Sequence, residues 1–516
     1  MRTRPLIWKA IQKVPGDKRF LKRIRRTLKT SLVYAAGQYA GKAVTLLLVP
    51  VYTAVLLPAD LGAVALVTIV GELYSVLLTS PIQSGFRRFY YAPEYKRARQ
   101  LFLFNISLFT FFISVVLCLV YAVVGIRFFP SFIDHEQAAI LVILSSVIVF
   151  FTPLTNICVS YNVLRERAIF ATAVSVIDVV LSASITIVSL IVYEMGASSM
   201  LIGKMCSSLV CLTILLTRTV PDFDIRVKCS LLISPLKYGL PLVFSGLSNR
   251  LIKSGDRLIL QYFSNSATVG LYSLGYNFGS TINFVIYAPV KKAMDPQIYQ
   301  LEEDKEYLKQ YLSTSANVVY FIGVFSTLIL SFFGIYLFHF MVQNTDFYQA
   351  WNVVPLVAFC YVQHGLGNIV GKGVLMRRKS AHLSAFVLIA AVTNVVGNVL
   401  LIPWLGMLGA AWATLLSYIV WNSLKVYYSA RFYGLHFRLK DLAMMTGWGF
   451  ALYLLHSMLP ASIPLWQNVA ASVVMVAVYP LLVWHFGGTS QKDREWLRCV
   501  WKRIYARHVE GSKELP

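Results

Sequence analysis

The chain has 516 residues, of which 57% are apolar and 14% are charged, and its formal net charge is +24. Soluble proteins are typically about 45–50% apolar and about 25% charged, so this composition excludes a soluble enzyme, a disordered chain and a disulfide scaffold. It indicates an integral membrane protein, in which each helical span uses about 20 residues. Whether the positive charge serves nucleic-acid binding depends on where the basic residues lie.

Hydropathy along the chain predicts an all-α polytopic membrane protein with about fourteen transmembrane helices. Long continuous apolar segments favour helices, because barrel strands are shorter and alternate in polarity. Prolines interrupt the last two segments. The apolar segments cover residues 33–54, 61–82, 101–125, 139–161, 169–193, 197–217, 238–261, 269–290, 314–340, 351–371, 383–403, 408–424, 443–457 and 466–486.

Basic residues lie almost entirely on one side of this topology. With the N-terminus placed inside the cell, 41 of the 47 lysines and arginines fall in the two terminal segments and six loops on that side, and one, Arg127, falls in an opposite loop. This asymmetry predicts a multi-pass protein with both termini in the cytoplasm. A nucleic-acid partner is not expected, because such binding needs one concentrated basic face. The basic segments 1–32 and 487–516 have amphipathic patterns that favour contact with anionic membrane lipids, although a solvated charged tail would also explain the latter.

Catalytic and metal-binding patterns do not emerge from the sequence. The seven cysteines and eight histidines are scattered, without CxxC or HExxH spacing. We therefore expect no metal, no cofactor and no enzymatic activity. A membrane polymerase, ligase or glycosyltransferase remains an alternative, but such enzymes need large extramembrane loops for their catalytic residues, and the predicted outer loops are short.

The chain contains an internal duplication. Residues 42–68 and 250–276 share a long helix, a short polar turn and a glycine, Gly62 or Gly270, that opens the next helix, at an offset of 208 residues. A weaker match relates 195–197 to 408–410. We predict two pseudo-symmetric six-helix lobes, a form that suits alternating access. The predicted domains are a basic segment at 1–32, lobes at 33–217 and 238–430, a linker at 218–237, two extra helices at 431–486 and a basic tail at 487–516.

Charged residues within apolar segments are the candidate functional residues, because a charge at bilayer depth costs roughly 2.5–3.5 kcal/mol on insertion scales. Such residues face a wet cavity or a partner. Cations outnumber anions among them, which suits an anionic ligand. In one reading the carboxylates neutralise the lysines, and in another they couple transport to a proton or sodium ion. The eight residues are Lys42, Glu72, Asp178 and Lys204 in the first half and Arg250, Lys253, Asp256 and Arg257 in the second.

Three of these cations are predicted to share one face of the seventh segment. Positions 250, 253 and 257 are spaced i, i+3 and i+7, which places them within about 60° on an α-helix. Asp256 lies three residues after Lys253, a spacing at which the two side chains can pair. The strip suits a phosphate or pyrophosphate ligand, whereas internal salt bridges are the alternative.

A further pair of arginines, Arg87 and Arg88, is predicted at the inner end of the second segment. Together with the aromatic residues that follow, they match an interfacial anchor. Binding of a head group at an inner mouth is a secondary possibility.

Several motifs resemble the polysaccharide-biosynthesis, or oligosaccharide flippase, family. They are VPVYT at 49–53, LLPADLG at 56–62, GFRRFYY at 85–91, SGDRLIL at 254–260, VGLYS at 269–273 and Asn394 with NVLLIP at 398–403. Their order and spacing extend over most of residues 30–430. The chain is therefore similar to Wzx-like members of the multidrug/oligosaccharidyl-lipid/polysaccharide exporter superfamily.

This resemblance implies a flippase in the bacterial cytoplasmic (inner) membrane that moves a polyprenyl-pyrophosphate-linked oligosaccharide for O-antigen, capsule or exopolysaccharide biosynthesis. The family's cationic lumen would map to Lys42, Arg250, Lys253 and Arg257. A polysaccharide polymerase and export machinery are implied as partners. Alternatives within the superfamily are a flippase for a peptidoglycan lipid precursor and a multidrug exporter, although an exporter of cationic drugs should have an acidic cavity.

Overall fold

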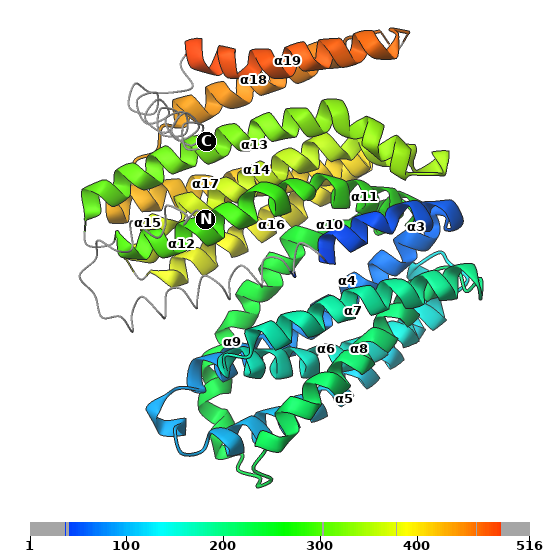
Figure 1. Cartoon of the computed structure of the whole chain (residues 1–516), viewed down its shortest axis with the longest axis vertical. Helices are drawn as coiled ribbons and strands as arrows, with labels where there is room; N and C mark the ends of the chain where they lie inside the picture. Colours follow the sequence, from blue (N-terminus) through cyan, green and yellow to red (C-terminus); the bar gives the residue numbers. More distant parts are fainter. Residues whose placement is uncertain (1–36, 38–40, 302–303, 378, 461, 487–516) are drawn as a thin grey trace, which may run out of the picture. The chain divides into compact units, whose positions relative to one another are not determined.

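The computed structural model describes residues 37, 41–301, 304–377, 379–460 and 462–486, and every regular element in this part of the chain is a helix (Figure 1). The predicted all-α fold class is thereby confirmed. The amphipathic segments expected within 1–32 and 487–516 lie outside the described residues.

Eleven helices in the described ranges are long and apolar enough to cross a membrane. They match eleven of the fourteen apolar segments, and each of the other three differs for a physical reason. The first is described only as the shorter helix Gly41–Val55. The eighth is divided into α11 (Ser266–Gly279) and α12 (Ala288–Gln300) by a π-helical turn. The thirteenth, α18 (Leu439–Ser457), has charged residues in its first turn.

The described residues form two compact units, the first made of the described residues up to 55 with 70–131 and 136–243. Helices α6, α7 and α8 pack on one another within it. The domain boundaries drawn from the sequence, including the linker at 218–237, stay a prediction. The helices of the first unit are α3 (Val49–Val55), most of α4 (Pro58–Phe89), nearly all of α5 (Arg99–Phe132), α6 (Ala138–Leu164), α7 (Ala168–Ile191), α8 (Ser198–Thr219) and α9 (Ser230–Arg250) as far as residue 243, with 3₁₀ turns at Pro93–Tyr95 and Val220–Asp222.

Within the first unit, α4 and α9 cross at two glycines. A Cβ at Gly85 would lie 2.4 Å from the carbonyl oxygen of Pro235, and a Cβ at Gly239 would lie 2.1 Å from that of Pro81. Only a residue without a side chain permits such a close backbone approach. Aromatic and aliphatic side chains of α4, α5 and α6 then fill the adjoining core, which includes Phe86 and Phe102.

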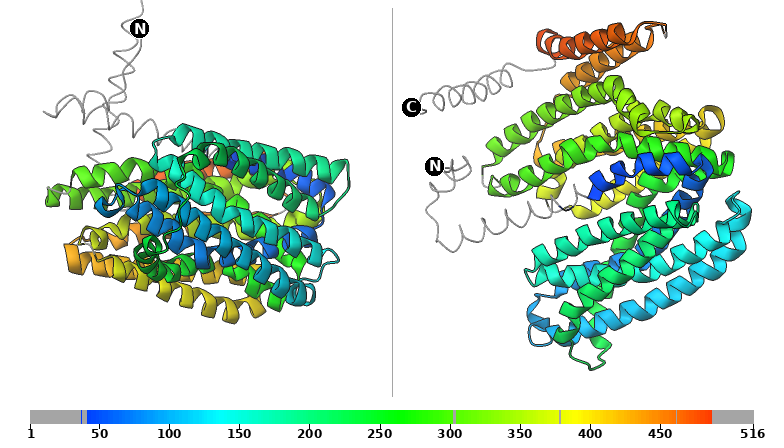
Figure 2. Two further views of the ribbon diagram at one scale, coloured as in Figure 1. Left: turned by 90° about the horizontal axis from the view of Figure 1, so that it is seen from below. Right: turned by 45° about the vertical axis from the view of Figure 1, so that its right-hand side comes forward.

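The second unit comprises residues 56–69, 132–135 and the described residues from 244 onward. Helix α13 contacts α14, α18 and α19, and α18 and α19 again lie beside α13 in the right-hand view of Figure 2. The elements that follow α9 are a π-helical turn, η3 (Leu251–Gly255), α10 (Asp256–Phe263), α11, a second π-helical turn, η4 (Asn283–Tyr287), α12, α13 (Lys305–Met341), the 3₁₀ segment η5 (Thr345–Val353), α14 (Val354–Val370), α15 (Lys372–Met376), α16 (Ser380–Leu405), α17 (Met407–Tyr433), α18 and α19 (Leu465–His485).

Equivalent glycines of the duplicated hairpins meet each other within the second unit. A Cβ at Gly62 would lie 1.7 Å from the carbonyl oxygen of Ser266, and a Cβ at Gly270 would lie 1.9 Å from that of Pro58. Ser266 is offset from Pro58 by the same 208 residues as Gly270 from Gly62. The contact between the starts of α4 and α11 is therefore reciprocal, as expected of two copies related by a local pseudo-two-fold axis.

Local signals in the sequence set several helix ends. Asn265 caps α11, since its side chain accepts a hydrogen bond from the backbone N–H of Thr268 at 2.9 Å. The turn between α16 and α17 places Gly406 at φ +54°, and Gly434 ends α17 at φ +65°.

Large apolar side chains also point outward, for example Trp404, which is 86% exposed. Such exposed apolar surface is typical of helices that face lipid.

Candidate functional site

The predicted charges of the first half of the chain include one clear ion pair, Lys204 with Asp178, and two half-buried residues, Lys42 and Glu72. Lys204 Nζ lies 2.5 Å from Asp178 Oδ2, and Ser207 donates a hydrogen bond to Asp178 Oδ1 at 2.8 Å. Asp178 thus neutralises Lys204, one of the two roles considered for it. Lys42 and Glu72 are half-buried, and both make further interactions. The ion-coupling roles of Asp178 and Glu72 stay predictions.

The two arginines predicted at the inner end of α4 are exposed. Arg87 donates hydrogen bonds from Nε and Nη2 to Ser160 Oγ at 3.1 and 3.0 Å, so it ties α4 to α6. The Arg88 guanidinium lies 6.0 Å from the ring centroid of Tyr238 on α9. Anchoring of α4 explains these contacts, and a head-group role for either arginine stays a prediction.

The predicted cationic strip on the seventh segment is interrupted, and this expectation was wrong in its geometry. The segment contains the π-helical turn Leu251–Gly255, which adds a residue to the turn. As a result, Lys253 is exposed and Arg250 is half-buried, whereas Arg257 is only 7% exposed. The three cations therefore do not share one exposed face. The charges of Arg250 and Lys253 do interact with each other.

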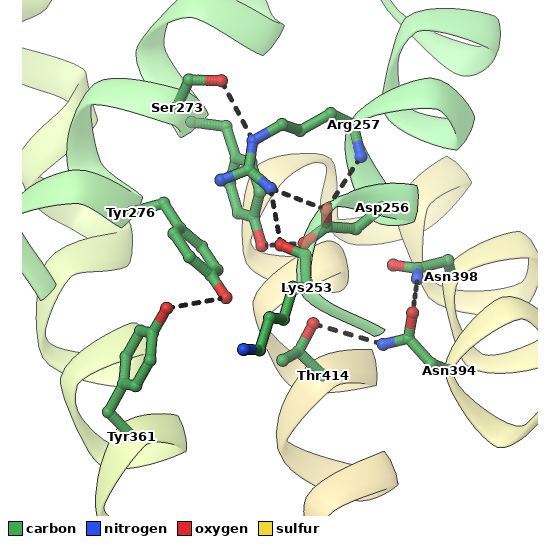
Figure 3. Close-up of polar contacts among 10 residues, drawn as sticks. Lys253, Asp256, Arg257, Ser273, Tyr276, Tyr361, Asn394, Asn398 and Thr414 are labelled. Carbon is green, nitrogen blue, oxygen red and sulfur yellow. Dashed lines mark hydrogen bonds and ion pairs between the residues drawn. The ribbon is translucent and has the colours of Figure 1, made fainter. Parts of the chain in front are cut away.

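Asp256 pairs with Arg257, which is the internal salt bridge considered as an alternative, and not with Lys253. The two side chains form an ion pair of 3.1 Å, and Asp256 is fully buried. The backbone carbonyl of Lys253, which lies in the π-helical turn, accepts a hydrogen bond from Arg257 Nη1 at 3.0 Å (Figure 3). The lysine thus contributes its backbone to the buried cluster, while its side chain stays exposed.

Helix α11 completes the buried cluster around the ion pair. Tyr272 donates a hydrogen bond to Asp256 Oδ2 at 2.5 Å. Arg257 Nε donates one to Ser273 Oγ at 3.2 Å (Figure 3). The Arg257 guanidinium also lies 4.3 Å from the ring centroid of Tyr276. Burying a charge is costly unless it is paired and hydrogen-bonded, and these contacts meet that condition. The cluster therefore has the construction of an internal ion pair, the alternative considered from the sequence.

A second polar chain lies near this cluster on α16 and α17. Asn398 Nδ2 donates to Asn394 Oδ1 at 3.0 Å, and Asn394 Nδ2 donates to Thr414 Oγ1 at 3.3 Å (Figure 3). All three residues are buried. Among the described residues, no group of three or more histidine, cysteine, aspartate or glutamate side chains is placed to hold a metal ion.

The sequence reasoning missed the tyrosines and the serine that surround the ion pair. Tyr272 and Tyr276 are spaced i, i+4, and this spacing puts them on one side of α11. That regularity was a usable signal, but aromatic residues at such spacing are also common in apolar cores. What the sequence could not supply was the pairing of this face with Asp256 and Arg257, which lie 16 residues away from their α11 partners.

Comparison with known proteins identifies one family. A family model described as "Polysaccharide biosynthesis protein" matches residues 53–334, which is more than half of the chain. No curated protein sequence matches the chain significantly.

Solved structures show the same fold at low sequence identity. A lipid II flippase, MurJ, in an inward closed conformation aligns with a TM-score of 0.71 and 13% identity, covering 88% of this chain and 98% of that protein. An inward-facing multidrug resistance MATE family transporter of the MOP superfamily aligns with a TM-score of 0.61 and 14% identity, covering 76% and 94%. A MOP superfamily transporter from Pyrococcus furiosus, with a binding pocket of reverse polarity, aligns with a TM-score of 0.53 and 12% identity, covering 79% and 95%.

Proposed function

Because the chain belongs to the polysaccharide biosynthesis protein family, we propose that it is a flippase that moves a polyprenyl-pyrophosphate-linked oligosaccharide across the bacterial cytoplasmic membrane by alternating access. The family match is the observation that carries this proposal. The product would serve the assembly of O-antigen, capsule or exopolysaccharide, with a polysaccharide polymerase and export machinery as later partners. Both termini would lie in the cytoplasm, as the distribution of lysine and arginine favours.

The pairing pattern in the second unit supports an anionic substrate. Asp256 is the carboxylate nearest in sequence to Lys253, and it forms its ion pair with Arg257. The Lys253 side chain remains exposed within an apolar helix. A cation in such a position is costly unless it faces water or an anion. Lysine binds phosphate as a compact point charge. We therefore place Lys253 and Arg250 ahead of Arg257 as contacts for a pyrophosphate, with Lys42 as the equivalent candidate of the first unit.

A second candidate is a flippase for a peptidoglycan lipid precursor. The alignment with the lipid II flippase, at a TM-score of 0.71, favours it. Both candidates transport a pyrophosphate-linked lipid, so the same cations would serve either substrate. A multidrug exporter is less favoured, because the charges of the apolar helices have a positive surplus.

Mass spectrometry of lipid-linked sugars after depletion of the protein tests the proposal. We expect a polyprenyl-pyrophosphate oligosaccharide to accumulate with its head group facing the cytoplasm. Accumulation of a peptidoglycan precursor would select the second candidate. Unchanged pools of both lipids would reject both functions.

Substitutions at equal protein abundance test the residues. Lys253→Ala, Arg250→Ala and Lys42→Ala should each reduce transport by at least tenfold, because each removes a charged contact to the phosphates. Lys96→Ala removes an exposed lysine outside the apolar helices and is the matched control. Normal transport by all three variants would show that these cations do not contact the substrate.

A further inference from the structure

A small pocket lies at one end of the second unit, and its lining does not include Asp256 or Arg257. It is formed between α12, α13, α14 and α15, and Figure 1 labels α12 and α15 at the same end of this unit. Its polar lining includes Lys291 and Asp295 of α12, Asn368 of α14 and Lys372 of α15. The enclosed part of the pocket has room for about one water molecule, and the rest is open to solvent. A ligand would therefore be held at the open mouth of the pocket, by the side chains that line it.

Positive charge exceeds negative charge around the pocket. Lys372 Nζ lies 2.5 Å from Asp295 Oδ1, so the carboxylate offsets one of the two lining lysines. Lys291 is exposed, and Asp295 is the only carboxylate among the described residues that line the pocket. At least one cationic side chain therefore remains for a ligand.

A third lysine lies directly behind the pocket. Lys425 of α17 is only 7% exposed, and its ammonium donates a hydrogen bond to the backbone carbonyl of Gly367 at 3.2 Å. It also lies 3.5 Å from the ring centroid of Trp421. No carboxylate in the described part of the chain forms an ion pair with Lys425. Lys425 is therefore held by contacts of its own, and the anion site rests on Lys291 and Lys372.

We propose that the open mouth of this pocket is an anion-binding site at which Lys291, Lys372 and the side-chain amide of Asn368 hold a phosphate group. The phosphate is either free in solution or part of a lipid head group, which offers the same oxygens. Lysines and an amide donor supply the hydrogen bonds that phosphate oxygens accept. Its use as the first docking point for a pyrophosphate-linked lipid rests on the proposed function.

Substitution of Asp295 should change phosphate binding in the opposite direction to substitution of the lysines. In an anion site this carboxylate competes with the ligand for Lys372, so Asp295→Asn should tighten phosphate binding several-fold. If the Lys372–Asp295 pair only braces α12 against α15, the same substitution should leave phosphate binding unchanged.

The experiment measures binding of inorganic pyrophosphate and of polyprenyl pyrophosphate to the purified full-length protein in lipid nanodiscs by calorimetry. We expect Lys291→Gln and Lys372→Gln each to weaken binding about tenfold, the loss typical of one charged hydrogen bond. Lys292→Gln removes the same charge from the next position of α12, outside the pocket lining, and should change binding less than twofold. Each variant must retain the melting temperature of the parent protein.

Four outcomes separate the proposals. Variant-sensitive binding of both probes supports the site and identifies free phosphate as sufficient, whereas variant-sensitive binding of the lipid alone supports the site and identifies the lipid as the source. Variant-sensitive binding of inorganic pyrophosphate without binding of the lipid supports the site and contradicts the proposed flippase. The site is overturned if binding by Lys291→Gln, Lys372→Gln and Asp295→Asn equals that of Lys292→Gln, or if the parent protein binds neither probe.

Discussion

Substitution of Gly62 by alanine should destabilise the protein through the reciprocal contact between α4 and α11. The added Cβ would lie 1.7 Å from the Ser266 carbonyl oxygen and 2.7 Å from its carbonyl carbon, closer than the 3.0 Å limit that real Cβ atoms respect. The obstacle is backbone, so rotation of a side chain cannot relieve it. The two helices must separate by more than 1 Å.

The expected cost follows from two opposed effects. Overpacking typically costs about 1–3 kcal/mol, and a backbone obstacle places this site at the upper end. Alanine recovers roughly 0.5–1 kcal/mol over glycine in a helix. The net destabilisation should be about 2 kcal/mol. Gly270→Ala should behave alike, because its Cβ would lie 1.9 Å from the Pro58 carbonyl oxygen.

Thermal unfolding of the purified protein measures this effect, with Gly447→Ala as the control. Gly447 lies in α18, where a Cβ would meet no atom within 4 Å, so its substitution should be neutral or slightly stabilising. The double variant Gly62→Ala/Gly270→Ala should lose less than the sum of the single losses, because both substitutions separate the same two helices. Equal melting temperatures for Gly62→Ala and Gly447→Ala would refute the close contact.

Three further predictions concern the ion pairs and the inner end of α4. Asp256→Asn should destabilise the protein by about 3 kcal/mol or more, because Arg257 is left buried without its counter-charge; retention of the parent melting temperature would contradict the burial of the pair. Asp178→Asn should lower the free energy of unfolding by only about 0–1 kcal/mol, since the Lys204 side chain is 44% exposed. The dependence of transport on a proton or sodium gradient would change in this variant only if Asp178 carries the coupling ion. Arg87→Gln should lower the melting temperature slightly through loss of the hydrogen bonds to α6, and an unchanged value would show that these bonds add no net stability.

The helices themselves were predictable because long apolar segments leave few other structures in a membrane. The duplication was also visible, and the contact of Gly62 with Gly270 gives it a physical basis, since both copies need a glycine at the same crossing. The weaker match, of residues 195–197 with 408–410, paired glycines that do not have the same structural role. Gly196 has φ +57°, and the residue with the same role before α17 is Gly406, three positions before the glycine matched by sequence.

The arrangement of the charges could not be derived from helical periodicity. The prediction for Arg250, Lys253 and Arg257 assumed 3.6 residues per turn, and the π-helical turn at 251–255 breaks that assumption. Hydropathy contains no signal for a single extra residue in a turn. Partners such as Tyr272 come from another helix, so only the folded chain reveals which cation remains exposed.

Burial also decides how a loss of transport should be interpreted. Arg257 is only 7% exposed and holds Asp256, so its removal affects the fold before any substrate is present. A transport defect at Arg257 would therefore be expected whether or not the residue touches a ligand. Lys253 differs, because its side chain is exposed and its backbone carbonyl supplies the contact to Arg257. Lys253→Ala keeps that carbonyl, so a transport defect at unchanged stability would report on the ammonium group itself.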